Sequence, residues 1–157
     1  MWPRAEKVVA LEMSEHAVVL LRQGLQRNAA ERVEVVTKNA FDFLREELDR
    51  GARYDTIVLD PPAFAKTKDR VEAALRGYKE INLRALQLLR EGGVLVTCSC
   101  SYHVSSELFE EMLRGAASDA RRPVQILERR GAGRDHPSLL GVPETRYLKV
   151  LIARTPA

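Results

Sequence analysis

The sequence has no long apolar run, few cysteines and few histidines. No stretch approaches the roughly 18 apolar residues of a membrane span, and the N-terminal residues lack the apolar core of a signal peptide. The two cysteines, Cys98 and Cys100, are so close in sequence that a disulfide between them is geometrically poor. The 3 histidines are widely spaced, with no cysteine or acidic residue at a matching spacing. We therefore expect a reduced, cytoplasmic protein without a metal site.

The length and composition favour a single domain over residues 1–157. A chain of 157 residues with 45% hydrophobic content is enough for one ordinary core. The 25 basic and 22 acidic residues leave a net charge of +3. This excess fits an anionic partner such as a nucleic acid, but ordinary proteins share it, so charge alone does not identify the partner.

Apolar segments with the length of strands alternate with segments of helical period. Strands are predicted over residues 7–11, 33–37, 55–59, 94–98, 124–127 and 147–153. Helices are predicted after Ser14, over 41–49, from about 78 to Gly92-Gly93, and after Ser105 or Ser106. Residues 63–77 predict a polar loop or a broken helix. The alternation predicts an α/β fold with a parallel sheet covered on both faces.

Apolar residues at helical spacing predict which helix faces meet the core. In the first helix these residues are Ala17, Leu20, Leu21 and Leu25. In the helix that ends at the glycine pair they are Tyr78, Ile81, Ala85, Leu88 and Leu89. In the last helix they are Leu108, Met112 and Ala116.

The first two strands end in residues that suit a nucleoside, and ligands of parallel sheets bind at the carboxyl ends of strands. Glu12 can accept hydrogen bonds from both ribose hydroxyls, although an acid here would also favour the start of the next helix. Asn39 could pair with an adenine ring on which Ala40 and Phe41 pack. By itself, however, Asn39 is more typical of a helix cap.

The third and fourth strands end in residues that suit catalysis. Asp60-Pro61-Pro62 forms a stiff turn that can aim a carboxylate at a base edge, and the alternative is a rigid loop with a solvated acid. Cys100 lies just past the fourth strand, near Asp60 if the two strands are neighbours. Most cysteines are inert packing, but this position favours Cys100 as a nucleophile.

Two groups of basic residues could contact phosphates. One group, in the loop after the prolines, consists of Lys66, Lys68 and Arg70. The other, bordering the last strands, consists of Arg121, Arg122, Arg129, Arg130 and Arg134. A solvated surface is the alternative for both groups, and the first is favoured because it adjoins the Asp60 turn.

Four motifs occur in an order typical of one known family. They are Val-Leu-Asp-Pro-Pro-Ala-Phe (58–64), Gly-Tyr-Lys-Glu-Ile-Asn-Leu (77–83), Gly-Gly-Val-Leu-Val-Thr-Cys-Ser-Cys-Ser (92–101) and His-Pro-Ser-Leu-Leu-Gly-Val-Pro-Glu-Thr-Arg-Tyr-Leu-Lys (136–149). From Lys7 onward the chain resembles the bacterial large-subunit ribosomal RNA cytosine-5 methyltransferases of the class I, Rossmann-like type. The resemblance implies a mostly parallel sheet with an antiparallel C-terminal strand, S-adenosyl-L-methionine as cofactor and ribosomal RNA as substrate.

The resemblance also implies which residues bind the cofactor. They are Glu12, Met13, Asn39, Ala40, Phe41, Asp60 and Pro61. Glu12 would hold the ribose, Asn39 would contact the adenine edge, and Met13 with Ala40 and Phe41 would pack around the adenine.

The catalytic residues implied by the resemblance are Cys100 and Asp60. The Cys100 thiolate would add to C6 of a cytosine, and Asp60 would stabilise the charge that develops on the base. Cys98 falls where the family does not require cysteine, so it is assigned to the strand. Phe64 or Tyr102 could stack on an unstacked target base.

Members of this family have a strand and a glycine-rich loop before the position of Lys7, and RNA-binding modules before those. The resemblance therefore implies a truncated domain without its first, central strand, which would lie between the strands that end at Glu12 and Asp60. Two unpaired strand edges and weak cofactor binding follow from that expectation. The missing segment in trans, or a homodimer partner, could complete the sheet.

Two other functions are compatible with these motifs. An amino-group methyltransferase of RNA uses an Asp-Pro-Pro-aromatic turn and needs no thiol, but here the aromatic Phe64 comes one residue late. A non-catalytic RNA-binding remnant of the family is the second alternative.

Overall fold

The structure is a computed structural model, and it describes residues 5–65 and 67–156. The chain divides into two compact units, with the boundary between Glu46 and Glu47. Lys66, predicted to contact phosphates, lies outside the described residues. No helix in the described ranges is both long and apolar enough to cross a bilayer.

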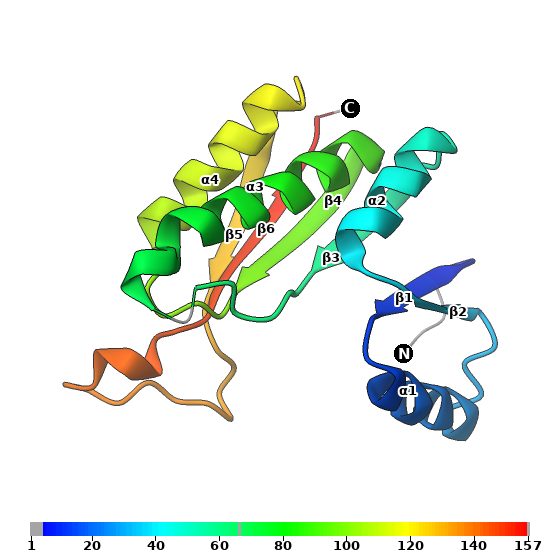
Figure 1. Ribbon diagram of the computed structural model, residues 1–157, viewed down its shortest axis with the longest axis horizontal. Coiled ribbons are helices and arrows are strands. Elements are labelled where there is room, and N and C mark those ends of the chain that lie inside the picture. Colours follow the sequence, from blue (N-terminus) through cyan, green and yellow to red (C-terminus); the bar gives the residue numbers. More distant parts are fainter. Residues whose placement is uncertain (1–4, 66, 157) are drawn as a thin grey trace. The chain divides into compact units, whose positions relative to one another are not determined.

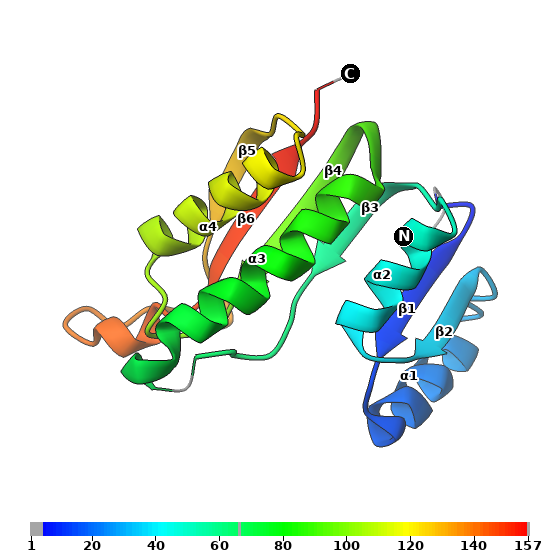
Figure 2. The same ribbon diagram turned by 45° about the horizontal axis from the view of Figure 1, so that its top comes forward.

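The N-terminal unit is built on two parallel strands. They are β1 (Val8–Glu12) and β2 (Val33–Thr37), and their register pairs Val8 with Val33 and Glu12 with Thr37. Helix α1 (Glu15–Arg27) connects them and lies beside β2, as Figure 2 shows. The Ser14 side chain accepts a hydrogen bond from the Ala17 amide at 3.4 Å, which confirms the predicted cap.

The predicted inward face of α1 is wrong at one position. Leu20 is 54% exposed, and the buried side chain of the helix is Val18. A two-stranded sheet offers only a narrow apolar surface. One side chain of the helix is therefore fully buried, and the other apolar side chains of its inward face stay partly exposed.

The C-terminal unit is a four-stranded sheet in the order β3-β4-β6-β5 (Figure 1). Its strands are β3 (Tyr54–Leu59), β4 (Leu89–Ser99), β5 (Gln125–Arg130) and β6 (Lys149–Arg154). Its helices are α3 (Val71–Leu88), α4 (Ser106–Asp119), and the short η1 (Lys68–Arg70) and η2 (Pro143–Thr145). Strand β3 is parallel to β4, whereas β6 is antiparallel to both β4 and β5. The predicted α/β fold with an antiparallel C-terminal strand is confirmed.

Helix α2 (Ala40–Asp49) follows β2 and runs across the boundary between the units. Helices α3 and α4 lie side by side on one face of the C-terminal sheet in Figures 1 and 2. The predicted face of α3 is confirmed, because Tyr78, Ile81, Ala85 and Leu88 are all buried.

The last helix corrects the prediction at one residue. Leu108 is 41% exposed, and Phe109 takes the buried place beside Met112 and Ala116. The Phe109 ring meets the Tyr78 ring edge-on at 5.5 Å between centroids. Burying a side chain of this size contributes about 1.5–3 kcal/mol, so the aromatic pair is a substantial part of the contact between α3 and α4.

The predicted end of α3 at Gly92-Gly93 is wrong. The helix ends at Leu88, and β4 begins at Leu89, whose backbone is already extended at φ −69° and ψ 141°. The glycines instead serve an irregular start of the strand, where the register against β3 shifts between Tyr54 and Thr56. Gly92 has φ +72°, and a Cβ on Gly93 would lie 2.8 Å from the Arg90 carbonyl oxygen. The start of α3 at Val71 also replaces part of the predicted loop.

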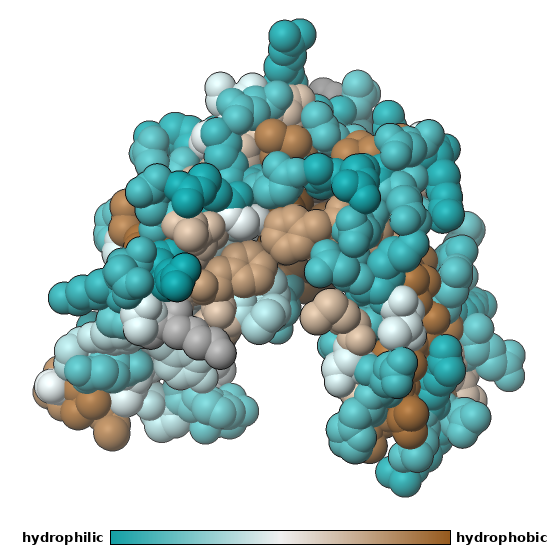
Figure 3. All heavy atoms as spheres, in the orientation of Figure 1, coloured by the Kyte–Doolittle hydropathy of each residue, from teal (hydrophilic) through white to brown (hydrophobic). Residues whose placement is uncertain are grey.

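The outer edges of β1 and β3 have no partner among the described residues. Strand β1 pairs only with β2 there, and β3 pairs only with β4. Val58 on β3 is 62% exposed and lies in one row with Val96 and Ile152 across the sheet. Figure 3 shows hydrophobic patches within a mostly hydrophilic surface. An unpaired edge next to exposed apolar groups favours self-association.

We expect Val58→Lys to reduce concentration-dependent association of the chain. A lysine on an edge strand disfavours pairing with a second copy. Sedimentation velocity over a range of protein concentrations would measure the effect. Leu108→Lys is the matched control, because Leu108 is also an exposed aliphatic residue but lies on a helix. Equal effects of the two variants would show that general hydrophobicity, not the strand edge, drives association.

Candidate active site

The Asp60 turn and the Cys100 segment lie next to each other at one end of the C-terminal sheet. Strands β3 and β4 are parallel neighbours, with Leu59 opposite Thr97, so the segments that follow them emerge together. The Cys100 sulfur lies 3.9 Å from the carbonyl oxygen of Pro61. The predicted proximity of Cys100 to the Asp-Pro-Pro turn is confirmed.

Cys100 is half-buried between two buried serines whose hydroxyls share one partner. The Tyr78 hydroxyl lies 3.1 Å from Ser99 Oγ and 3.0 Å from Ser101 Oγ. Ser101 Oγ also accepts a hydrogen bond from the Ala65 amide at 3.1 Å. This network joins α3, the loop after the prolines and the end of β4, so it holds the backbone on both sides of the thiol.

The sequence analysis placed Tyr78 in the core and did not predict the hydrogen bonds of its hydroxyl group. The helical period explains why the residue is buried, but only the tertiary structure shows what the oxygen meets. A tyrosine in an otherwise aliphatic helix face was the available signal, because a buried phenol needs a hydrogen-bond partner.

Lys149 is a second residue that sequence reasoning did not single out. It begins β6 opposite Ser99, and only 7% of it is exposed. Its ammonium donates hydrogen bonds to the carbonyl oxygens of Ser101 at 2.6 Å and Tyr147 at 2.8 Å. Burial lowers the pKa of Lys149, and the charge of nearby Cys100 acts in the opposite direction.

The two free cysteines differ in burial. Cys98 is 8% exposed, and its pKa rises to about 11, chiefly because of burial and further because of the charges of Asp60 and Cys100. At neutral pH Cys98 is therefore a thiol and a poor nucleophile. Cys100 is less buried and lies at the open end of the strand, so it is the accessible sulfur.

The other groups predicted around the target base differ in exposure. Asp60 is exposed and makes no hydrogen bond within residues 5–65 and 67–156, so its carboxylate is available to a ligand. The Phe64 ring packs against Tyr78 with 4.6 Å between centroids. Tyr102 is 46% exposed and is the better placed of the two predicted aromatic residues to stack on a base.

The residues predicted to hold the nucleoside gather at the carboxyl ends of β1 and β2 in the N-terminal unit. Glu12 Oε1 accepts hydrogen bonds from the amides of Met13 and Ser14, both at 2.8 Å. The Asn39 side-chain oxygen accepts from the Phe41 amide at 2.8 Å, which confirms that Asn39 caps α2. Its amide nitrogen lies 3.9 Å from the Met13 sulfur. The structure thus brings Glu12, Met13 and Asn39 together.

The arginines near the last strands are largely engaged with the protein. Arg129 forms two hydrogen bonds with Glu110, Arg130 pairs with Glu128, and Arg122 donates to the Leu89 carbonyl at 2.8 Å. Lys68 and Arg70 are exposed in η1. The preference for the loop group as phosphate contacts stays a prediction.

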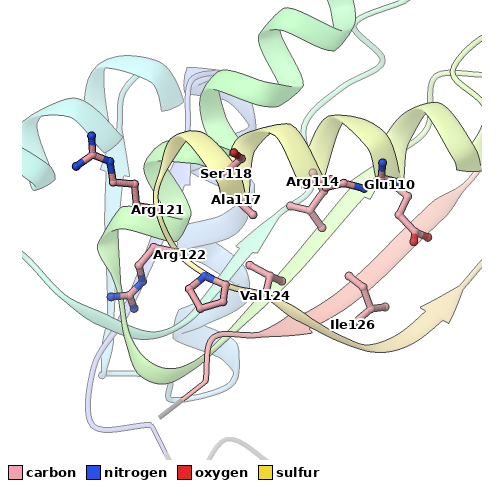
Figure 4. Close-up of a pocket in the computed structure, with 10 residues that line it drawn as sticks. Glu110, Arg114, Ala117, Ser118, Arg121, Arg122, Val124 and Ile126 are labelled. Carbon is pink, nitrogen blue, oxygen red and sulfur yellow. The ribbon is translucent and has the colours of Figure 1, made fainter.

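Two cavities lie elsewhere on the C-terminal unit. One of about 520 Å³ lies between the end of α4 and the start of β5, and Figure 4 shows Arg121 and Arg122 at its margin with Val124 and Ile126 on the β5 side. It contains none of the predicted catalytic or cofactor-binding residues. Another of about 370 Å³ is lined by the start of α4, the end of β5 and the start of β6, including Lys149. No group of His, Cys, Asp or Glu within the described ranges could hold a metal ion, and the prediction of a metal-free site stays a prediction.

The sequence model of the methyltransferase small domain matches residues 2–122 of the chain. The chain belongs to this family. It is 42% identical over 150 residues to the ribosomal RNA large subunit methyltransferase I of Escherichia coli (strain SMS-3-5 / SECEC), with 94% of this chain and 38% of that protein covered. The identity to the same protein of strain O157:H7 (EC4115 / EHEC) is 41%, with the same coverage. The chain thus spans about two fifths of the length of these relatives.

Solved structures show the same fold. A putative methyltransferase, SMU.776, complexed with SAH, superposes with a TM-score of 0.82 at 18% identity, covering 96% of this chain and 39% of that one. NSun6 from Pyrococcus horikoshii with SFG superposes with a TM-score of 0.66 at 20% identity, covering 94% and 41%. The predicted Rossmann-like methyltransferase fold is confirmed.

We expect iodoacetamide at pH 7.5 to modify Cys100 and leave Cys98 unmodified. The pKa of Cys98, about 11, keeps its thiol protonated at this pH, and burial shields it. Peptide mass spectrometry of the folded chain would locate the label. Cys98→Ser should retain one label per chain and Cys100→Ser should lose it. A label on Cys98 in the folded protein would contradict this assignment.

Proposed function

We propose that this chain is the catalytic part of an RNA methyltransferase that transfers a methyl group to C5 of a cytosine in ribosomal RNA through a covalent Cys100 adduct. The observation that supports the proposal most strongly is the half-buried Cys100 held beside the Asp60-Pro61 turn. The names of the relatives, ribosomal RNA large subunit methyltransferases, support the substrate. A nucleophilic thiol has a clear purpose in carbon methylation and none in transfer to an amino group.

The chemistry of the N-terminal group fits the nucleoside part of S-adenosyl-L-methionine. Backbone amides orient the Glu12 carboxylate through Oε1, and Oε2 has no partner among the described residues. A carboxylate oriented in this way can accept hydrogen bonds from ribose hydroxyls. Met13 is 65% exposed and, with Ala40 and Phe41, would supply apolar contacts to the adenine. When bound, the cofactor supplies the methyl group.

The residues of the C-terminal unit would act on the base. The Cys100 thiolate forms a bond to C6, and the C5–C6 π electrons move through the ring toward N3, which makes C5 nucleophilic. A protonated Asp60 carboxyl at the N3 edge would donate a hydrogen bond to N3 and so stabilise this charge. After methylation, loss of the C5 proton restores the C5–C6 double bond, and the electron pair of the sulfur–C6 bond returns to the Cys100 sulfur.

The unpaired edges of β1 and β3 support the proposal that a further strand completes the domain. Each edge presents backbone amides and carbonyls without a strand partner among the described residues. A segment supplied within a longer chain, in trans or by a homodimer partner would satisfy these groups. The glycine-rich loop expected with that strand would add backbone contacts to the cofactor.

Methyl transfer is the direct test of the reaction and of its nucleophile. The chain would be joined to the part of the Escherichia coli relative that it does not cover, and this extended protein would be incubated with labelled S-adenosyl-L-methionine and ribosomal RNA. We expect label at cytosine C5, loss of at least about 10³-fold in rate with Cys100→Ala, and little change with Cys98→Ala. Nucleoside analysis by mass spectrometry would identify the methylated atom.

The other outcomes of this experiment favour the alternatives. Transfer that survives Cys100→Ala, with the methyl group on an exocyclic nitrogen, would replace the thiol mechanism with amino-group methylation. RNA binding without any transfer would identify a non-catalytic remnant of the family.

We expect Glu12→Gln to weaken S-adenosyl-L-methionine binding to the extended protein by about 10- to 100-fold. Loss of the charge removes charge-assisted hydrogen bonds to the ribose worth about 1.5–3 kcal/mol. Isothermal titration calorimetry would measure the dissociation constants. Glu15→Gln is the control, because Glu15 lies on the first turn of α1, three residues further along. Unchanged affinity in Glu12→Gln would remove Glu12 from the cofactor site.

A further inference from the structure

Lys149 is the only charged side chain in the buried class among the described residues. It forms no ion pair there, and its two hydrogen-bond partners are the neutral carbonyl oxygens of Ser101 and Tyr147. Burying an ammonium without a carboxylate partner costs several kcal/mol, and hydrogen bonds to carbonyls offset only part of this cost. A neutral hydrogen-bond donor could bind these two carbonyl oxygens without the cost of burying a positive charge.

The buried ammonium of Lys149 lies close to the Cys100 segment. The residue pairs with Ser99 across β4 and β6, and its ammonium binds the carbonyl of Ser101, so it contacts the residues on either side of Cys100 in sequence. The electrostatic interaction between Lys149 and Cys100 favours the charged form of the lysine. Because the attraction between two charges is mutual, it also stabilises a Cys100 thiolate.

We propose that Lys149 is a positioning residue for Cys100, whose ammonium holds the Ser101 carbonyl in place and stabilises negative charge on the neighbouring sulfur. The role of Lys149 in catalysis rests on the proposed function. In that reaction the sulfur is negatively charged twice, before its bond to C6 forms and after that bond breaks. Each time Lys149 would stabilise the charge without exchanging a proton with the base.

Several other titratable or charged groups lie near this pair. Cys98 on β4 interacts electrostatically with Asp60 after β3 and with Cys100, and the Tyr78 hydroxyl of α3 lies within hydrogen-bond distance of Ser101 Oγ. The cavity beside Lys149 is also lined by Glu110, Arg129, Arg130 and Arg146. Glu110 and Arg129 neutralise each other in an ion pair.

The test measures the rate at which iodoacetamide alkylates Cys100 in the full chain between pH 6 and 10. It needs neither RNA nor cofactor, so its result is independent of whether the proposed methyl transfer occurs. We expect Lys149→Met to slow alkylation at pH 7 by about ten-fold and to move the rate profile to higher pH. Lys149→Gln should do the same, although its amide can still donate to a carbonyl. Lys149→Arg, which retains the charge, should restore part of the rate.

The control separates electrostatics from loss of stability. Thr155 is buried just after β6, and its hydroxyl bonds to the Arg90 carbonyl at 2.9 Å, at the far end of β4 from Cys100. Thr155→Val should lower the melting temperature and leave the alkylation profile of Cys100 unchanged. A folded Lys149→Gln protein with the wild-type rate and profile would overturn the proposal.

A reciprocal measurement covers the case in which no Lys149 variant folds. In the wild-type chain and in Cys100→Ala, the pKa of Lys149 can be followed by NMR of ¹³Cε-labelled lysine. Removing the sulfur should lower the pKa of Lys149 further, because the charge that favours the ammonium is gone. An identical titration of Lys149 in the two proteins would overturn the electrostatic role.

Discussion

The parallel pairing of β3 and β4 is the constraint on which the candidate active site depends. With Leu59 opposite Thr97, the chain leaves both strands at the same end of the sheet, and the Asp60 turn meets the Cys100 segment there. Residues about 40 positions apart in sequence thus become neighbours through backbone hydrogen bonds alone. A shift of this register would separate the carboxylate from the thiol.

A buried polar network then sets the local geometry. The Tyr78 hydroxyl meets both serines that flank Cys100, and Lys149 holds the carbonyl that follows it. Burying such polar groups is costly unless each of them finds a hydrogen-bond partner. Here the partners come from helix α3, the loop after the prolines, and strands β4 and β6. The resulting segment is rigid on both sides of the sulfur while the sulfur itself remains half-exposed.

The two cysteines illustrate how environment divides the roles of identical side chains. Cys98 lies inside the strand, where burial raises its pKa to about 11, and Cys100 lies just beyond the strand, between anchored serines. Their spacing suggested one reactive and one structural thiol, and the family resemblance suggested which was which. The contrast in burial supplies the physical reason.

The sequence by itself determined the order of strands and helices, the cap at Ser14, a cap at Ser105 or Ser106, and the apolar face of α3, because each depends on period and local hydrogen bonding. It also indicated the strand ends at which Glu12, Asn39, Asp60 and Cys100 lie. Only the tertiary structure decided the end of α3 at Leu88, the exposure of Leu20 and Leu108, and the meeting of Tyr78 and Lys149 with the Cys100 segment. These features depend on which surfaces are available to cover an apolar face and on which buried polar atoms find partners. Both are properties of packing between distant segments, and a linear pattern of residues does not contain them.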